Sequence, residues 1–178
     1  MTNMLWNTPK GLSWFLLATM VAVIAAVLAF EHLGGFIPCK LCLEQRQPWY
    51  IGIVLMVGVV MSYQFNPPPW LRRGLLALVT ILMAYSLFLA IRHTGVEWQL
   101  WSGPGDCGAV GSNLTSNASD LLNQLNDTLP PSCDEAAGRF LGLSFAGWNV
   151  LASLAALIIA VRAFRFATGA AQEVETRT

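Results

Sequence analysis

Four apolar stretches dominate this sequence and limit what the chain can fold into. The first covers residues 12–30 without a charged side chain, close to the ~20 residues that a helix needs to cross a bilayer core. The others lie at 49–65, 74–91 and 145–160. Hydrophobic residues make up 55% of the chain and charged residues only 11%, a balance outside the range of soluble domains. The sequence therefore predicts an integral membrane protein.

Each apolar stretch is expected to be a helix, because the backbone finds no water to bond inside a bilayer. The predicted fold class is all-α, an integral membrane antiparallel four-helix bundle. A single membrane domain covers residues 1–178, with spans at about 12–31, 44–65, 72–91 and 145–165 and outer loops at about 32–43 and 92–144. The second span must borrow residues from Leu43 onward, and Pro48 would then cost a helical hydrogen bond or kink the helix.

Basic residues suggest the orientation of the four spans. Both termini fall on one side, which carries six basic residues against four on the other: Lys10, Arg72, Arg73, Arg162, Arg165 and Arg177 against Lys40, Arg46, Arg92 and Arg139. Because basic loops tend to stay in the cytoplasm, the bias favours cytoplasmic termini. All four cysteines then lie outside the cytosol, where disulfides persist. Lys10 alone precedes the first stretch, which disfavours a cleaved signal peptide.

Cys39 and Cys42 form a Cys-x-x-Cys pair at the entrance to the second span. Such a pair is either a thiol-disulfide redox centre or half of a zinc site. A thiolate is stabilised at a helix N-terminus or beside a cation, and Cys42 has both in reach if the helix starts near Leu43. Arg46 is costly near the membrane core, so it either extends to the headgroups or binds a carbonyl of a lipid-soluble acceptor such as a quinone.

The long loop at 92–144 carries the other two cysteines, Cys107 and Cys133. Between them, apolar residues at helical spacing predict a short amphipathic helix that lies on the membrane or packs on the protein's own loops. These residues are Ala118, Leu121, Leu122, Leu125 and Leu129. A zinc site would need all four cysteines, yet the loop pair is 26 residues apart and zinc gives Arg46 no role. No metal is therefore expected.

Several other patterns are interpreted without a function. Six tryptophans near span ends are expected to anchor the helices at the headgroups: Trp14, Trp49, Trp70, Trp98, Trp101 and Trp148. The segment 103–108 matches a dinucleotide fingerprint but follows no predicted strand. His32 and His93 lie at span ends, where a histidine is usually an interfacial polar residue. The net charge of zero, without a basic stripe, argues against a nucleic-acid partner.

The combination of four spans, the string Pro38-Cys39-x-Leu41-Cys42-x-x-Gln45-Arg46 and the widely spaced Cys107 and Cys133 resembles one known family. It is similar to the disulfide bond formation protein B (DsbB) family of bacterial inner membranes. Vitamin K epoxide reductases share the bundle but carry their Cys-x-x-Cys after the loop cysteines, whereas here it comes first. The order of the cysteines therefore favours the DsbB family.

The resemblance implies a thiol oxidase that passes electrons from a periplasmic thioredoxin-fold dithiol protein (DsbA-like) to a membrane quinone, ubiquinone or menaquinone. By position, Cys107 would meet the partner's thiolate and Cys133 would attack Cys39. Cys42 would face the quinone, with Arg46 and His93 at the same cofactor site. The resting pairing stays open: Cys39–Cys42 with Cys107–Cys133, or Cys39–Cys133.

Two alternatives remain from the sequence. One is a sister branch of the same architecture, with a dedicated partner or reversed electron flow. The other is a structural membrane protein whose cysteines hold zinc or form inert disulfides.

Overall fold

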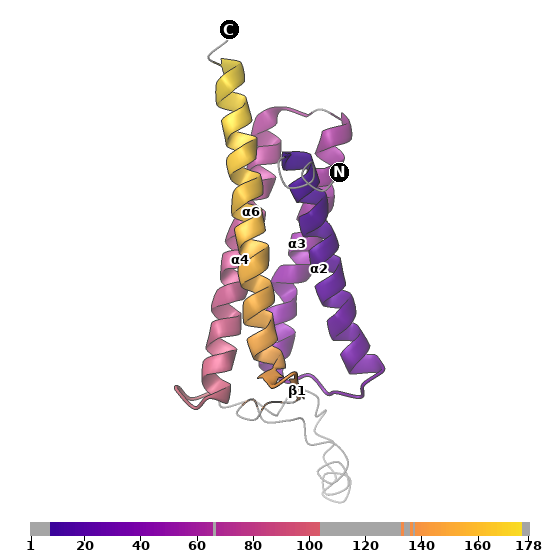
Figure 1. The fold of residues 1–178 in the computed structure, drawn as a ribbon, viewed down its shortest axis with the longest axis vertical. Coiled ribbons are helices and arrows are strands. Elements are labelled where there is room, and N and C mark those ends of the chain that lie inside the picture. The colour runs from indigo at the N-terminus through magenta and orange to yellow at the C-terminus, as the bar shows by residue number, and fades with distance from the viewer. Residues whose placement is uncertain (1–7, 66, 104–132, 134–135, 137, 176–178) are drawn as a thin grey trace, which may run out of the picture.

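Four long helices make up most of the chain in the computed structural model, which describes residues 8–65, 67–103, 133, 136 and 138–175 (Figure 1). The helices are α2 (Pro9–His32), α3 (Lys40–Phe65), α4 (Pro69–Glu97) and α6 (Phe145–Glu175). All four are long and apolar enough to cross a membrane. Two short strands, β1 (Arg139–Phe140) and β2 (Leu143–Ser144), pair antiparallel just before α6.

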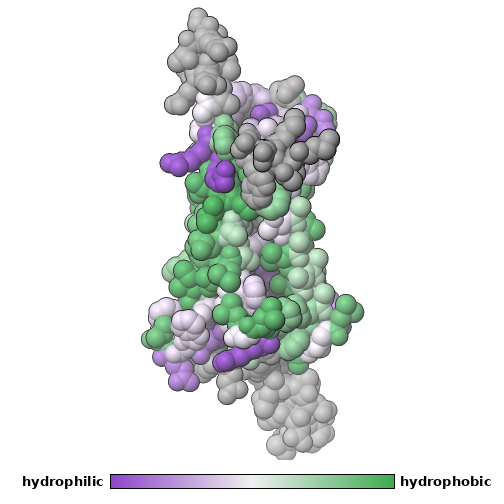
Figure 2. Space-filling view, viewed as in Figure 1, coloured by the Kyte–Doolittle hydropathy of each residue, from purple (hydrophilic) through white to green (hydrophobic). Residues whose placement is uncertain are grey.

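The helices form an antiparallel bundle in which α2 and α4 each pack against both α3 and α6. The first turn of α2 and the last turns of α6 lie at one end of the bundle, and the β hairpin lies at the other (Figure 1). On the face drawn in Figure 2, hydrophobic residues form a band across the middle of the bundle, and hydrophilic residues lie toward both ends. This band matches the apolar core of a bilayer, and the predicted four-helix membrane bundle is confirmed.

The bundle core is built from residues that recur along one face of each helix. In α2 they are spaced four apart: Leu12, Leu16, Met20 and Ile24. α6 contributes mainly small side chains to the same core, Ala156, Ala160 and Ala163. Small residues let helix backbones approach closely, which favours helix association in lipid, where burial of apolar surface contributes little.

Helix α3 begins at Lys40, earlier than the expected start near residue 44. The carbonyl of Cys39 accepts the first helical hydrogen bond, from Leu43 N at 3.2 Å, so Cys39 occupies the N-cap position. Pro48 lies inside the helix and is buried. Its ring removes one backbone donor but does not end the helix, because packing in the bundle compensates for that lost bond.

The other differences from the sequence prediction lie at element ends and in the long loop. α4 and α6 both extend beyond their predicted apolar stretches. Pro69 is the first residue of α4, a position where proline is tolerated because its missing N–H would have no helical partner. Trp49 is not an interfacial anchor, because it is only 1% exposed. The hairpin of β1 and β2 was not predicted, since two-residue strands leave no periodic signal. The predicted amphipathic helix within 118–129 lies outside the described residues, as does Cys107.

Candidate active site

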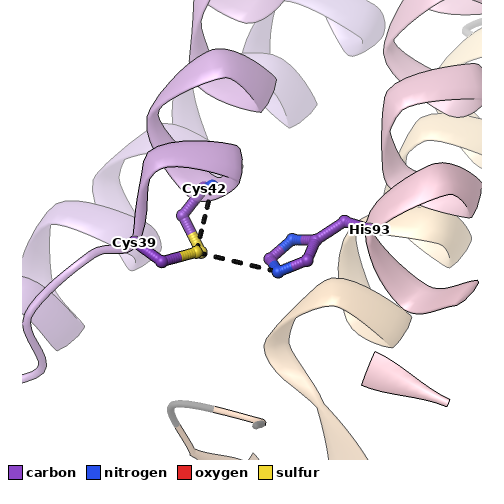
Figure 3. A group of neighbouring side chains, drawn as sticks. All are labelled: Cys39, Cys42 and His93. Atoms are coloured by element: carbon purple, nitrogen blue, oxygen red, sulfur yellow. Dashed lines mark hydrogen bonds between the residues drawn. The ribbon is translucent and has the colours of Figure 1, made fainter. Parts of the chain in front are cut away.

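The two thiols of the Cys-x-x-Cys pair lie together at the start of α3. Both are free cysteines, and their Sγ atoms share a hydrogen bond at 3.0 Å. The backbone N–H of Cys42 also donates to Cys39 Sγ at 3.4 Å, because Cys39 caps the helix. Figure 3 shows His93 of α4 facing the same sulfur, with Nε2 at 3.7 Å from Cys39 Sγ. Cys39 is therefore the thiol to which the surrounding polar groups point.

These contacts lower the pKa of the Cys39 thiol from 9.0 to about 4. The largest cause is the side-chain hydrogen bond with Cys42; burial opposes it, and His93 and the backbone hydrogen bond act in the lowering direction. The sequence left the start of this helix open. α3 starts three residues before Leu43, which gives the N-cap position to Cys39 and puts Cys42 in the first turn. Cys39 is thus a thiolate at neutral pH and a nucleophile in disulfide exchange.

We expect the low pKa to appear directly in the alkylation of Cys39. In reduced protein with Cys107→Ser and Cys133→Ser, Cys39 should react with iodoacetamide at a nearly constant rate as the pH falls from 9.0, and lose half of that rate near pH 4. The sign follows from the lowered pKa, since the thiolate persists above about 4. Mass spectrometry of the Cys39 peptide measures the rate. Adding Cys42→Ala, which removes the main hydrogen bond, should move the midpoint upward.

A network of two buried polar side chains, His93 and Gln45, and a half-buried one, Asn149, leads away from Cys39. His93 is 3% exposed and Gln45 of α3 is 5% exposed. Gln45 Nε2 lies 2.5 Å from His93 Nδ1, and Gln45 Oε1 accepts a hydrogen bond from Asn149 Nδ2 of α6. This network of side chains therefore links α3, α4 and α6 beside the thiol pair. Polar groups at this depth stay buried only when they are paired.

Glu97, one turn after His93, holds the hairpin against α4. Its Oε1 lies 3.9 Å from His93 Nε2, and its Oε2 accepts a hydrogen bond from the Ser144 hydroxyl at 2.5 Å. The Ser144 oxygen in turn accepts from Gly147 N at 3.1 Å, which caps the first turn of α6. These bonds fix the beginning of α6 next to the thiols.

Arg46 lies one turn past Cys42 and does not extend freely to the headgroups. Its Nη1 forms an ion pair with Glu31 Oε2 at the end of α2, and the two side chains are only 13% and 24% exposed. A partly buried guanidinium needs such a partner, because the uncompensated charge is costly near lipid. Glu31 was not predicted from the sequence. Its signal was a single acidic residue at the end of an otherwise uncharged span.

A cavity of about 340 Å³ opens beside the thiol pair between α2, α3 and α6. Its size falls within the roughly 300–1,000 Å³ range of small-molecule sites. The walls are mostly apolar or aromatic: Val23, Ile24, Ala26, Val27, Phe30, Phe36, Pro38, Trp49, Phe140, Phe145, Ala146, Trp148 and Ala152. The polar or reactive side chains on the lining are Cys42, Arg46, Glu31, Gln45, His93 and Asn149. Cys42 therefore lines the cavity, and a cation and amides lie close by.

Cys133 also packs against the thiol pair but does not line the cavity. It is 1% exposed and forms a buried cluster with Cys39, Leu41 and Val96, against which Cys42 packs. Cys133 is disulfide-bonded, whereas Cys39 and Cys42 are free, so the Cys39–Cys133 pairing is not the one present. A disulfide-bonded sulfur does not coordinate zinc, so Cys133 is not a zinc ligand in this pairing.

The arrangement brings together most of the residues that the sequence proposed. Cys39, Cys42, Arg46, His93 and Cys133 meet at one end of the bundle. Gln45 belonged to the predicted motif without a role, and Asn149 was missed. Its signal was an amide inside an apolar span, where an unpaired polar group is costly.

In a membrane bundle, a free dithiol that borders a cavity through Cys42 and packs with a disulfide-bonded cysteine through Cys39 defines a class of protein, the membrane disulfide oxidoreductases. The family follows from comparison of the sequence. A family model described as "Disulfide bond formation protein DsbB" matches residues 9–163, and the chain belongs to this family. The resemblance seen in the sequence is confirmed.

Curated relatives named Disulfide bond formation protein B agree with this assignment. The protein of Paracidovorax citrulli is 25% identical, over 94% of this chain and 96% of the relative. That of Verminephrobacter eiseniae is 28% identical, over 90% and 92%, and that of Pasteurella multocida is 29% identical, over 80% and 78%. No solved structure matches the chain significantly.

Proposed function

We propose that this protein oxidises a soluble periplasmic dithiol protein of the thioredoxin fold (DsbA-like) and passes the electrons to a membrane quinone. The observation that supports this most is the position of the Cys39–Cys42 pair. Cys42 borders the apolar cavity, and Cys39 packs in the cluster that contains Cys133. A dithiol in this position can exchange electrons with a second cysteine pair on one side and with a lipid-soluble acceptor on the other.

The loop cysteines would act first, through thiol-disulfide exchange. A thiolate of the reduced partner attacks a Cys107–Cys133 disulfide and forms a mixed disulfide; the partner's second thiol then displaces Cys107, so the partner leaves oxidised and two thiols remain. The Cys133 thiolate can then attack Cys39 of an oxidised Cys39–Cys42 pair, since the two residues share one buried cluster. Closing of the loop disulfide releases Cys39 and Cys42 as thiols. Two electrons and two protons have then passed from the partner protein to the Cys39–Cys42 pair.

The cavity suits the head of a quinone, ubiquinone or menaquinone. Aromatic rings of Phe30, Phe36 and Phe145 pack on one another at its wall, at centroid distances of 5.1 to 6.3 Å. Such rings offer flat apolar surfaces to another ring. Arg46 and His93 at the lining would orient a carbonyl oxygen beside Cys42. When bound, a quinone supplies an acceptor for two electrons and two protons.

We place the protein in the bacterial inner membrane, with cytoplasmic termini and the cysteine-bearing loops in the periplasm. The support is the excess of basic residues near the ends and the 72–73 turn, together with the family's partner chemistry. Disulfides made in a soluble partner also persist in an oxidising compartment such as the bacterial periplasm.

The test is oxidation of a reduced DsbA-like protein by the purified chain in detergent or nanodiscs, with and without a short-chain quinone. Oxidation over many turnovers only when quinone is present would support the proposal. An equal rate of partner oxidation in the absence of both quinone and oxygen would refute it. Net reduction of an oxidised partner by a quinol under matched conditions would instead favour the sister branch with reversed electron flow.

A further inference from the structure

Both ring nitrogens of His93 have partners, and the partners differ in kind. On one side, Nδ1 lies 2.5 Å from the amide nitrogen of Gln45. On the other side, Nε2 lies 3.7 Å from the Cys39 sulfur and 3.9 Å from a carboxylate oxygen of Glu97. A neutral imidazole carries one proton, and its neighbours decide which nitrogen holds it.

The neighbours of Gln45 fix the direction of this hydrogen bond. Gln45 Oε1 already accepts from Asn149 Nδ2, so the Gln45 amide presents its nitrogen to His93. An amide NH₂ group can only donate, which makes Nδ1 the acceptor. In a neutral ring whose Nδ1 accepts, the proton is on Nε2. The other side of the ring agrees, because both groups facing Nε2, the Cys39 sulfur and the Glu97 carboxylate, are acceptors.

We propose that Gln45 and Asn149 are positioning residues that hold His93 with its proton on Nε2, so that the ring donates a hydrogen bond to the Cys39 sulfur. His93 then acts as a fixed donor to a thiolate and not as a base that removes the thiol proton. The inference rests on the proposed function in treating Cys39 as the thiol that exchanges with Cys133. It adds α6, through Asn149, to the elements that control that thiol.

The hydrogen bond from His93 matters when the Cys39–Cys42 pair is reduced. A donor aimed at Cys39 stabilises the negative charge that this sulfur carries whenever the dithiol is open. Two further titratable groups among the described residues lie at this contact. Cys42 is hydrogen-bonded to Cys39, and the Glu97 carboxylate faces His93 Nε2 beside the Cys39 sulfur. If the Gln45 amide were lost, the proton could move to Nδ1, and a lone pair on Nε2 would face the thiolate. That contact is repulsive.

The test measures Cys39 and needs neither quinone nor partner, so its failure is distinguishable from failure of the proposed function. The full-length protein with Cys107→Ser and Cys133→Ser is reduced, and the alkylation rate of Cys39 is followed against pH by mass spectrometry. We expect Gln45→Leu, and separately Asn149→Leu, to shift the midpoint of Cys39 upward by about one pH unit. His93→Gln should shift it at least as far, and Gln45→Leu should add nothing in that background.

Gln47→Leu is the matched control, because Gln47 lies two residues away on the exposed face of α3 and should leave the midpoint unchanged. Gln45→Leu and Asn149→Leu act from two different helices, so a folding defect in one leaves the other informative. The proposal is overturned if both variants keep the wild-type midpoint. It is equally overturned if Gln45→Leu and His93→Gln shift the midpoint additively, since a residue that acts through His93 has no effect once His93 is gone.

Discussion

Cys42→Ser should abolish quinone-dependent turnover, lowering the steady-state rate of partner oxidation by at least about 10³-fold. Cys42 is the thiol that lines the cavity, and without its sulfur the Cys39–Cys42 disulfide that quinone regenerates cannot form. Serine keeps nearly the same size, so the helix start and the adjacent packing remain. The rate is measured with reduced DsbA-like protein and a short-chain quinone, both in excess.

The same variant provides its own control. The loop disulfide is untouched by Cys42→Ser, so one equivalent of reduced partner should still be oxidised in a single turnover without quinone. Loss of this first turnover would indicate misfolding. Sustained wild-type oxidation with quinone would contradict the assigned role, because it would mean that electrons reach the acceptor without Cys42.

Arg46→Met should raise the KM for quinone roughly 10- to 100-fold, while kcat falls less. The expected size is that of one hydrogen bond from a charged donor, about 1.5–3 kcal/mol. Arg46 is a basic residue on the cavity lining, and it lies one helical turn past Cys42. The quinone concentration is varied at saturating partner, so that binding and turnover are separated.

Glu31 supplies the control for Arg46, since the two side chains form an ion pair at the cavity wall. Glu31→Gln should leave the KM for quinone within about 3-fold, because the glutamine amide oxygen still accepts a hydrogen bond from the guanidinium, which remains in place. The double variant Arg46→Met with Glu31→Gln should keep the raised KM. If Glu31→Gln alone weakens quinone binding as strongly as Arg46→Met, the ion pair and not the donated hydrogen bond is what the site needs.

The sequence was sufficient for the four helices because each one is a long apolar run, and length is set by bilayer thickness. It was less informative about where helices begin. The start of α3 depended on whether Cys39 or a later residue would cap it, and that choice is made by backbone contacts that no periodicity reports. Pro48 was expected to cost a hydrogen bond or kink the helix, and the packed membrane helix α3 continues through it.

In the candidate site, too, some residues could be predicted from the sequence and others could not. The cysteines and Arg46 were predictable because their residue types and spacing carry chemistry. The partners that tune them were not, since they come from other helices. Glu31 lies 15 residues before Arg46, and Asn149 lies 104 residues after Gln45. Only the packing of the bundle brings these pairs together, because α2 packs against α3, and both α2 and α4 pack against α3 and α6.

His93 illustrates what tertiary packing adds. Its place at the end of α4 suggested only an interfacial residue or, by resemblance, a neighbour of the quinone. It does line the cavity, but its Nε2 points to Cys39. Its role as a quinone contact stays a prediction, which the quinone KM of His93→Gln would test beside that of Arg46→Met.

The central claim is that Cys39 and Cys42 pass their electrons to quinone. The most direct measurement mixes fully reduced protein with quinone under anaerobic conditions, quenches it with acid, and counts the free thiols at each cysteine by alkylation and mass spectrometry. We predict that Cys39 and Cys42 lose their thiols together, that one quinol forms for each disulfide, and that both stay reduced without quinone. A dithiol that remains reduced in excess quinone, or is oxidised equally without it, would contradict the account.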